Sequence, residues 1–256
     1  MRNLCKRFEG YNLVSMKSVS QLHFSRKPPS THLSCGLLET CYPAGSVLDD
    51  AHDRADLGCA RTLVKRGRRL YESGDPINAI YSIMAGTFKT CTVTEKGEEQ
   101  VMGFYMRGAI MGLDAMATGH YSATTVAIED SQVCIVTAEC LEEHCQKDMN
   151  VAKRIHAAMA KEINSRQRMM IMLGSKTAEE RVASFLIELA ATYASLGFSS
   201  LDMNLVMTRD EIGSYLGLSL ETVSRILSIF QDRRLLTVNQ KHIRILDIAA
   251  LERLSG

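Results

Sequence analysis

The sequence predicts an α+β protein in which a β-roll, a long helix and a C-terminal winged helix-turn-helix follow one another. Three observations predict it. Short strands with turn residues between them fill residues 62 to 136, a helical apolar period starts near residue 150, and a pair of short two-faced helices lies near the C-terminus. Many short strands with glycines at their corners are typical of a barrel or roll, rather than of a parallel α/β sheet.

The composition is that of a globular chain whose bulk charge favours no particular partner. The 256 residues are 46% hydrophobic and 23% charged, and the formal net charge is +1. This length holds one large domain or two modest ones. Because there is no long apolar run and no apolar segment after the basic start, we expect neither a spanning helix nor a secretory signal. We therefore expect a cytoplasmic protein with no membrane partner.

We divide the chain into four parts. Residues 1–34 are basic, lack apolar periodicity and contain Pro28 and Pro29, which predicts a mobile tail. A sensor region with the β-roll covers 35–149, a dimerisation helix covers 150–174, and the winged helix-turn-helix covers 175–256. Within the roll, the pattern predicts strands over 79–84 and 88–93, and one continuous strand over 127–136.

The long helix carries one apolar stripe whose members advance by threes and fours. The stripe consists of Ile155, Met159, Ile163, Arg166 and Met170. An ordinary core-facing helix would also give such a stripe, but a charge is rarely tolerated in a sealed core. Arg166 therefore favours a dimer seam or a wet edge. In a symmetric dimer, two such arginines would oppose association until something compensates them.

The C-terminal helix pair begins with a capping box, because Thr208 and Glu211 are spaced to exchange hydrogen bonds at a helix start. Gly217 then provides a tight turn, and Ser219 is placed to cap the second helix. That helix has an apolar face at the spacing i, i+3, i+4, i+7, made of Val223, Ile226, Leu227 and Phe230. Helix, glycine turn and helix in this order are typical of a helix-turn-helix.

The opposite face of the second helix has the chemistry of base recognition. Glu221 can accept from cytosine N4, Arg225 can donate to guanine O6 and N7, and Ser224 is a small hydroxyl between them. The strands expected on either side of Lys241 form a wing that brings this lysine near a phosphate. The alternative is an αα-hairpin with a polar surface, which the order of cap, turn, two-faced helix and wing disfavours.

Charge near the C-terminus is too balanced for strong non-specific attraction to DNA. From Thr208 onward there are seven Arg or Lys against six Asp or Glu. Affinity must therefore come from specific contacts and from a second copy of the motif in a dimer. A two-fold dimer predicts an inverted-repeat site with half-sites about one helical turn apart.

Three segments resemble the CRP/FNR superfamily of bacterial transcription regulators, and within it the FNR branch of anaerobic regulators. They are KTCTVTEKGEEQVMGF at 89–104, AEERVASF at 178–185 and MTRDEIGSYLGLSLETVSR at 207–225. The resemblance implies that Glu221, Ser224 and Arg225 read a TTGAT-type half-site in double-stranded DNA. We also expect Thr208, Arg209 and Lys241 to contact DNA. The resemblance also implies that a roll turn contacts RNA polymerase; here that turn is Thr94, Glu95, Lys96, Gly97 and Glu98.

The same resemblance implies an oxygen-labile [4Fe–4S] cluster on an N-terminal C-x2-C-x5-C set and one roll cysteine. Cys134 matches the roll cysteine, and Cys35 and Cys41 match the last two of the N-terminal set. The remaining position holds His32; alternatively, the middle cysteine of the set is the missing one. Histidine ligates iron in some clusters. Other conceivable donors are Cys5 and Cys59, although we read Cys59, Cys91, Cys140 and Cys145 as small apolar side chains.

Three alternatives follow for the sensor and the function. Capture of cAMP is not expected, because the matching stretch 119–125 contains no arginine for the phosphate. A regulator of the same fold could lack a cluster and sense thiol oxidation or another effector. A metal-dependent or thiol enzyme is disfavoured, because the sequence has no H-E-x-x-H, no G-x-S-x-G and no phosphate-binding glycine loop.

Overall fold

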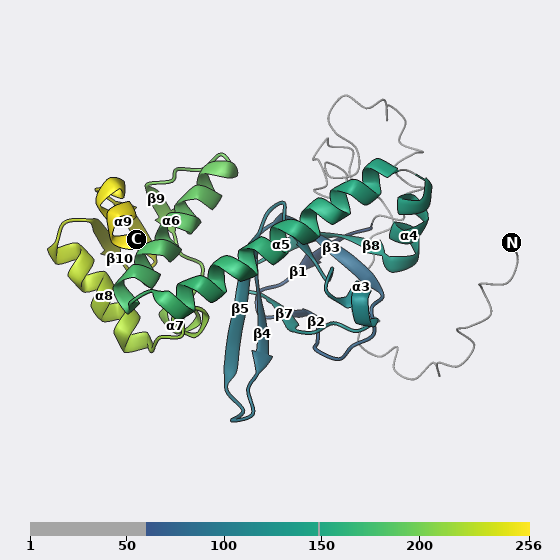
Figure 1. The fold of residues 1–256 in the computed structure, drawn as a ribbon, viewed down its shortest axis with the longest axis horizontal. Helices are drawn as coiled ribbons and strands as arrows, with labels where there is room; N and C mark the ends of the chain where they lie inside the picture. Colours follow the sequence, from purple (N-terminus) through teal and green to yellow (C-terminus); the bar gives the residue numbers. More distant parts are fainter. Residues whose placement is uncertain (1–59, 148) are drawn as a thin grey trace, which may run out of the picture. The chain divides into compact units, whose positions relative to one another are not determined.

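The computed structural model describes residues 60–147 and 149–256, which form a β-roll, a long helix and a C-terminal helical domain with a small sheet (Figure 1). The expected α+β class is confirmed. Among the described residues, no helix is long and apolar enough to cross a bilayer.

Two four-stranded antiparallel sheets build the roll. Their strand orders are β1-β8-β3-β6 and β2-β7-β4-β5. The strands are β1 (Ala60–Val64), β2 (Arg69–Tyr71), β3 (Ala79–Ala85), β4 (Thr87–Val93), β5 (Glu99–Met106), β6 (Ile110–Met111), β7 (Thr124–Ala127) and β8 (Ser131–Thr137). A short helix, α3 (Ala115–Thr118), follows β6.

The expectation of one continuous strand over 127–136 is wrong. The chain leaves β7 at Ala127 and enters β8 at Ser131, and the two strands belong to different sheets. Asp130 occupies the crossing, where its carboxylate accepts from Lys65 Nζ at 2.6 Å and from the Arg66 N–H at 3.0 Å. These contacts form only in the folded roll, so periodicity along the chain does not reveal the break.

Aromatic side chains fill the interior of the roll. Tyr121 stacks on Tyr71 with ring centroids 3.9 Å apart, and Tyr71 stacks on Tyr81 at 5.5 Å. The Tyr121 hydroxyl donates to the Ala79 carbonyl at 2.6 Å, which satisfies its polar end inside the core. Phe88 is fully buried in the same cluster.

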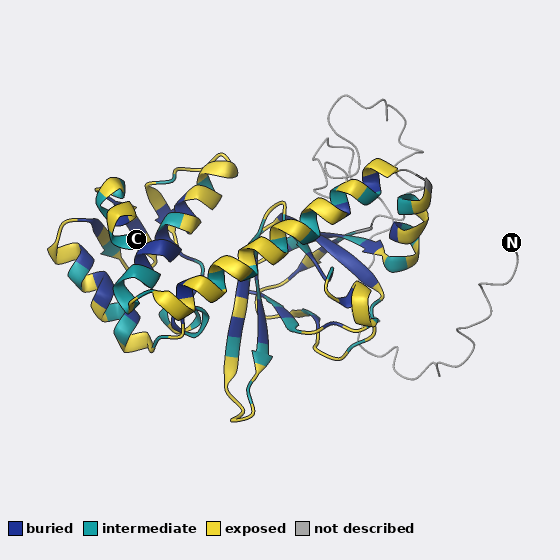
Figure 2. Cartoon of the chain, viewed as in Figure 1, coloured by how far each residue is buried: buried dark blue, intermediate teal, exposed yellow. Residues whose placement is uncertain are grey.

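Helix α4 (Ala138–Lys147) leads from the roll into the long helix α5 (Met149–Ser175). At its N-terminal end α5 buries Val151 and Ile155 against the roll, in one cluster with Ile80, Cys134 and Leu141. Figure 2 shows that much of the remaining length of α5 is exposed in the single chain.

The C-terminal domain contains α6 (Ala178–Ser195), β9 (Asp202–Asn204), α7 (Arg209–Leu216), α8 (Leu220–Asp232), β10 (Leu236–Asn239), β11 (His242–Ile245) and α9 (Ile248–Ser255). Its antiparallel sheet has the order β10-β11-β9. The apolar faces of the helices meet in one core, with Leu216, Val223 and Phe230 fully buried. The expected helix pair and wing hairpin are both confirmed.

Candidate nucleic-acid interface

The first helix of the pair starts at the expected capping box. The Thr208 N–H donates to Glu211 Oε2 at 2.8 Å, and the Glu211 N–H donates to Thr208 Oγ1 at 3.1 Å. The helix ends at Gly217, whose φ of +65° is left-handed and suits glycine. At Gly213 a Cβ would lie 2.6 Å from the Leu218 carbonyl oxygen, so the two helices are held at close range.

The second helix, α8, separates into the two faces that the sequence predicts. Ser219 caps it by accepting from the Thr222 N–H at 3.2 Å. Glu221 and Arg225 are exposed on the outer face, and Ser224 is half-buried beside them. The pKa of the Glu221 carboxyl is lowered by hydrogen bonds from the Glu221 backbone N–H and the Ser219 hydroxyl. The lowered pKa favours the charged form, which accepts hydrogen bonds. The outer face therefore presents an acceptor and a donor fork together.

The wing turn between β10 and β11 contains Gln240, in a left-handed conformation with φ +56°, and the exposed Lys241. Arg209, which the sequence assigns to DNA contact, donates from Nη2 to the Gln240 carbonyl at 3.2 Å. Burial lowers the pKa of the Arg209 guanidinium, in keeping with its half-buried position. Arg209 thus joins the start of α7 to the wing turn, whereas Thr208 and Lys241 are exposed.

Sequence reasoning missed the N-terminus of α6 beside the recognition helix. A shallow pocket is lined by Thr177 to Glu180, at the start of α6, together with Arg225 and Arg253. Thr177 and Glu180 form a second capping box. The Thr-x-x-Glu spacing was visible in the sequence and could have identified this helix start.

The expected dimerisation stripe divides into two parts. Ile155 is only 2% exposed and packs in the core of its own subunit, so its assignment to a seam is corrected. Met159 is half-buried against the same core. Farther along, Ile163 is 58% and Met170 is 73% exposed. The stripe analysis missed Ile171, which is also largely exposed.

Arg166 has charge partners in its own chain. Its Nε donates to Glu162 Oε1 at 2.9 Å, and its other nitrogens donate to the Met102 carbonyl and the Tyr105 hydroxyl. Glu162 also accepts from the Tyr105 hydroxyl at 2.7 Å. The compensation for this charge therefore comes from one turn earlier on α5 and from β5, within one subunit.

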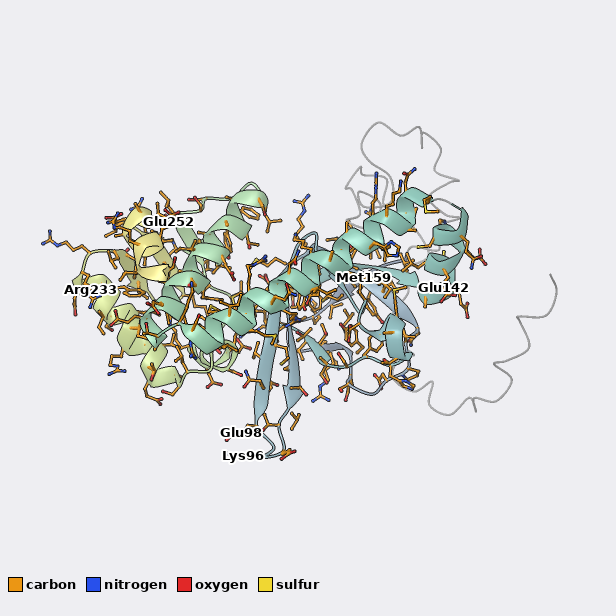
Figure 3. The ribbon with its side chains drawn as sticks, in the orientation of Figure 1. Lys96, Glu98, Glu142, Met159, Arg233 and Glu252 are labelled. Atoms are coloured by element: carbon orange, nitrogen blue, oxygen red, sulfur yellow. The ribbon has the colours of Figure 1, made fainter. Side chains whose placement is uncertain are left out.

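The turn expected to contact RNA polymerase is the exposed tip of the β4–β5 hairpin, where Lys96 and Glu98 project outward (Figure 3). Two backbone bonds of 2.9 Å close it, from the Gly97 N–H to the Thr94 carbonyl and from the Thr94 N–H to the Glu98 carbonyl. Glu95 is exposed beside them.

The cysteines of the described residues fall into two kinds. Cys91, Cys140 and Cys145 are thiols outside any disulfide, and the Cys140 sulfur lies 3.6 Å from His144 Nδ1. Burial is the largest cause raising the pKa of Cys91, to about 11, so this thiol stays protonated at neutral pH. Cys134 is fully buried and its sulfur is disulfide-bonded.

The remaining ligand candidates, His32, Cys35 and Cys41, lie outside the described residues, as do Cys5 and Cys59. Residues 60–147 and 149–256 hold no group of three or more side chains that could bind a metal by themselves.

A winged helix-turn-helix joined to a β-roll through a long helix defines a class, that of DNA-binding transcription regulators. Residues 180–254 match the Crp-like helix-turn-helix domain, and residues 61–148 match the cyclic nucleotide-binding domain. The fumarate and nitrate reduction regulatory protein of Escherichia coli (strain K12) is 39% identical over 223 residues, 87% of this chain and 89% of that protein. The transcriptional regulatory protein Btr of Bordetella pertussis is 36% identical over 230 residues, 90% of this chain and 95% of that protein.

Among solved structures, FixK2 from Bradyrhizobium japonicum is similar with a TM-score of 0.72 at 30% identity, covering 77% of this chain and 98% of FixK2. The chain belongs to the CRP/FNR family of transcription regulators. It is a DNA-binding regulator and not an enzyme.

Proposed function

We propose that this chain is a cytoplasmic, dimeric regulator of the FNR type, which reads TTGAT-like inverted repeats and responds to oxygen or redox state. The observation that carries the DNA-reading part is the outer face of α8. There Glu221 and Arg225 are exposed in the first two turns, while Val223 and Ile226 anchor the opposite face in the core. The N-terminal turns of a recognition helix are those that enter the major groove in this motif.

The surrounding residues fit contacts with the DNA backbone. Arg209 joins the start of α7 to the wing turn through its hydrogen bond to the Gln240 carbonyl. Thr208 and Lys241, which neighbour these two residues in the sequence, are both exposed. Phosphate contacts position the protein, and the Glu221, Ser224 and Arg225 face then specifies the sequence.

A pair of variants separates these two roles. Arg225→Ala should cost about 1–3 kcal/mol on a TTGAT inverted repeat and relax discrimination at one guanine. Lys241→Ala should weaken binding about equally on all sequences and reduce the salt slope by about 1. Both are measured by fluorescence anisotropy with matched and single-base-changed duplexes over a salt series. An equal loss on every duplex for Arg225→Ala would contradict base readout by this residue.

The exposed row Ile163, Met170 and Ile171 supports the dimer. A single chain leaves these apolar side chains in water, and a partner's α5 would bury them. Two recognition helices related by a two-fold axis then match half-sites about one helical turn apart. The β4–β5 hairpin tip, Thr94 to Glu98, is the surface we propose for RNA polymerase in transcription activation.

The position of Cys134 supports sensing through this residue. Cys134 shares one core cluster with Val151 and Ile155 of α5. A chemical change at its sulfur would therefore alter the packing of the helix that carries the exposed apolar residues of the proposed dimer seam. Ser82 lies directly opposite Cys134 across the β3–β8 pair, and its buried hydroxyl has no hydrogen-bond partner in the described part of the chain. A hydroxyl in that position is available to donate to a sulfur ligand.

A [4Fe–4S] cluster fits this donor chemistry, with Cys134, Cys35 and Cys41 as thiolate ligands and the fourth ligand open, His32 being one candidate. When bound, the cluster supplies an oxygen-labile redox centre. Cys134 must be a reduced thiol to ligate iron, because its disulfide form has no thiolate to offer. The roll around it excludes water, since Ile80 and Val136 are buried in the same cluster.

Anaerobic purification under reducing conditions, followed by iron and sulfide analysis and visible absorption, tests the cluster. We expect iron and sulfide in the wild type, a large loss in Cys134→Ala, and wild-type content in the control Cys91→Ala. Iron-free wild-type protein would contradict the cluster.

A second candidate function is a regulator of the same fold that senses thiol oxidation without a cluster. The disulfide at Cys134 favours it, because a disulfide can be reduced and Cys134 packs in one core cluster with residues of α5. DNA affinity compared with and without a thiol reductant, in iron-free protein, measures this directly. Cyclic nucleotide sensing has less support, since Tyr71, Tyr81 and Tyr121 pack together in the roll interior.

A further inference from the structure

The β-roll also contacts the helix-turn-helix through a set of side chains that neither the recognition face nor the sensor uses. Lys89 of β4 lies between two carboxylates, with Nζ 2.6 Å from Glu99 Oε1 and 3.0 Å from Glu211 Oε1. The Lys89 and Glu211 side chains are only 13% and 17% exposed. Because water screens this ion pair less, the attraction between its charges is stronger than in an ion pair on the open surface.

Backbone-directed hydrogen bonds reinforce this ion pair one helical turn farther along α7. The Val101 N–H donates to Ser214 Oγ at 2.8 Å, and the Ser214 hydroxyl donates to the Glu99 carbonyl at 3.1 Å. Gln100 Nε2 donates to the Ser214 carbonyl. Strand β5 therefore holds α7 by both its side chains and its backbone.

Three aromatic rings close the other side of the contact. Phe104 of β5 meets Tyr215 of α7 with centroids 5.3 Å apart, and both meet Phe185 of α6 edge-on at 6.2 and 6.0 Å. We call the whole set the roll–HTH docking site. It comprises Lys89, Glu99, Gln100, Val101, Phe104, Phe185, Glu211, Ser214 and Tyr215.

The docking site fixes the first helix of the pair at a residue that already organises its start. Glu211 uses Oε2 for the capping box with Thr208 and Oε1 for Lys89. Since Gly213 brings α7 within contact of the turn before α8, the orientation of α7 determines the orientation of α8. A constraint on Glu211 is therefore passed to the face that carries Arg225.

We infer that Lys89 is a positioning residue for DNA recognition: through Glu211 it holds the helix-turn-helix in a fixed orientation on the roll. This inference rests on the proposed two-fold reading of an inverted repeat. In a dimer, both recognition helices must engage at once, and a fixed orientation removes the cost of aligning the second one. The same contact joins α7 to the hairpin whose tip is proposed for RNA polymerase.

The test uses the full chain and inverted TTGAT repeats of three spacings. The native-like repeat has half-sites about one helical turn apart, and the other two repeats are 2 bp shorter or 2 bp longer. Lys89→Met keeps the apolar stem and removes the charge. We expect it to bind the native-like repeat about tenfold more weakly than the wild type. We also expect it to lose part of the preference for that spacing, which a purely structural role would not change. Lys89→Arg should restore both.

Two further variants guard against a folding defect. Ser214→Ala removes the hydroxyl that bonds to β5, and it should also weaken binding and reduce the spacing preference. Glu211→Gln keeps a capping residue without the charge, and we expect the same two effects. Lys65→Met is the matched control. Lys65 forms an ion pair of 2.6 Å with Asp130 on the exposed roll surface, which is the same length as the Lys89–Glu99 pair. Unchanged or tighter binding by Lys89→Met and Ser214→Ala would overturn the inference. A wild type indifferent to spacing would instead contradict the two-fold reading, and the affinity comparison would still decide the role of Lys89.

Discussion

The recognition domain and the region around Cys134 are built in opposite ways. The surface proposed to read DNA comes from one continuous stretch, Thr208 to Lys241, whose caps, turn and faces follow from local sequence rules. The environment of Cys134 combines β3, β8, α4 and α5, and its proposed further ligands come from residues far earlier in the chain. Spacings within one or two helical turns therefore predict the first surface, whereas the surroundings of Cys134 follow only from the fold of several elements.

The largest effect expected within the recognition domain comes from its core. Phe230→Ala removes a fully buried ring from α8 and should cost about 3–5 kcal/mol of unfolding free energy. Urea unfolding followed by circular dichroism measures this. DNA binding should disappear under conditions where the domain unfolds.

Ser228 on the exposed side of the same helix is the matched control. Its hydroxyl donates to the Ser224 carbonyl at 3.1 Å, a bond that water can replace. Ser228→Ala should change stability by no more than about 0.5 kcal/mol. Similar losses for both variants would contradict the separation of α8 into a buried and an outer face.

The two ends of α5 offer a sharper form of the comparison. Ile155→Ala should lower the unfolding free energy by about 2–4 kcal/mol, because this side chain belongs to the core around Cys134. Met170→Glu should leave the folded subunit nearly unchanged but place like charges at the proposed seam, so we expect dissociation to monomers. Sedimentation velocity and urea unfolding of both variants separate the effects. A Met170→Glu protein that remains dimeric would exclude this part of α5 from the seam.

Sequence reasoning succeeded where structure is determined by neighbours along the chain. The capping box at Thr208, the cap at Ser219 and the buried face through Phe230 all depend on spacings within one or two helical turns. It failed where a distant segment decides. The break between β7 and β8 follows from their pairing in two different sheets, with partner strands that lie far earlier in the sequence.

The charges show the same limit. Arg166 looked anomalous on an apolar stripe, because nothing in the sequence indicated that Tyr105 and the Met102 carbonyl would meet it. Glu211 was readable as a capping residue, but its second partner, Lys89, comes from another domain. Hydrophobic periodicity records which face of an element is buried and carries no information about which polar group meets it there.

The smallest effect expected tests that second partner through pH. Burial disfavours the charge of Glu211, but the Thr208 N–H and the Lys89 ammonium outweigh it, so the pKa of the Glu211 carboxyl lies below its usual value. A carboxyl with a lowered pKa in the folded state contributes stability that is fully present above its unfolded pKa, about 4.3. This stability is lost as the pH falls through the folded value. Glu211→Gln retains a capping residue but gives up this contribution, which is at most about 1 kcal/mol.

Thermal unfolding of the wild type and Glu211→Gln from pH 7 to pH 3 measures the difference. We expect the wild type to be the more stable at pH 7 and the gap to shrink below about pH 4.3, because protonation then makes the two side chains alike. Glu142→Gln, on the exposed side of α4, is the matched control and should give no such gap at either pH. A Glu211 gap that stays constant across this range would mean that the stabilisation comes from packing or capping geometry, and that the charge of Lys89 does not act through Glu211.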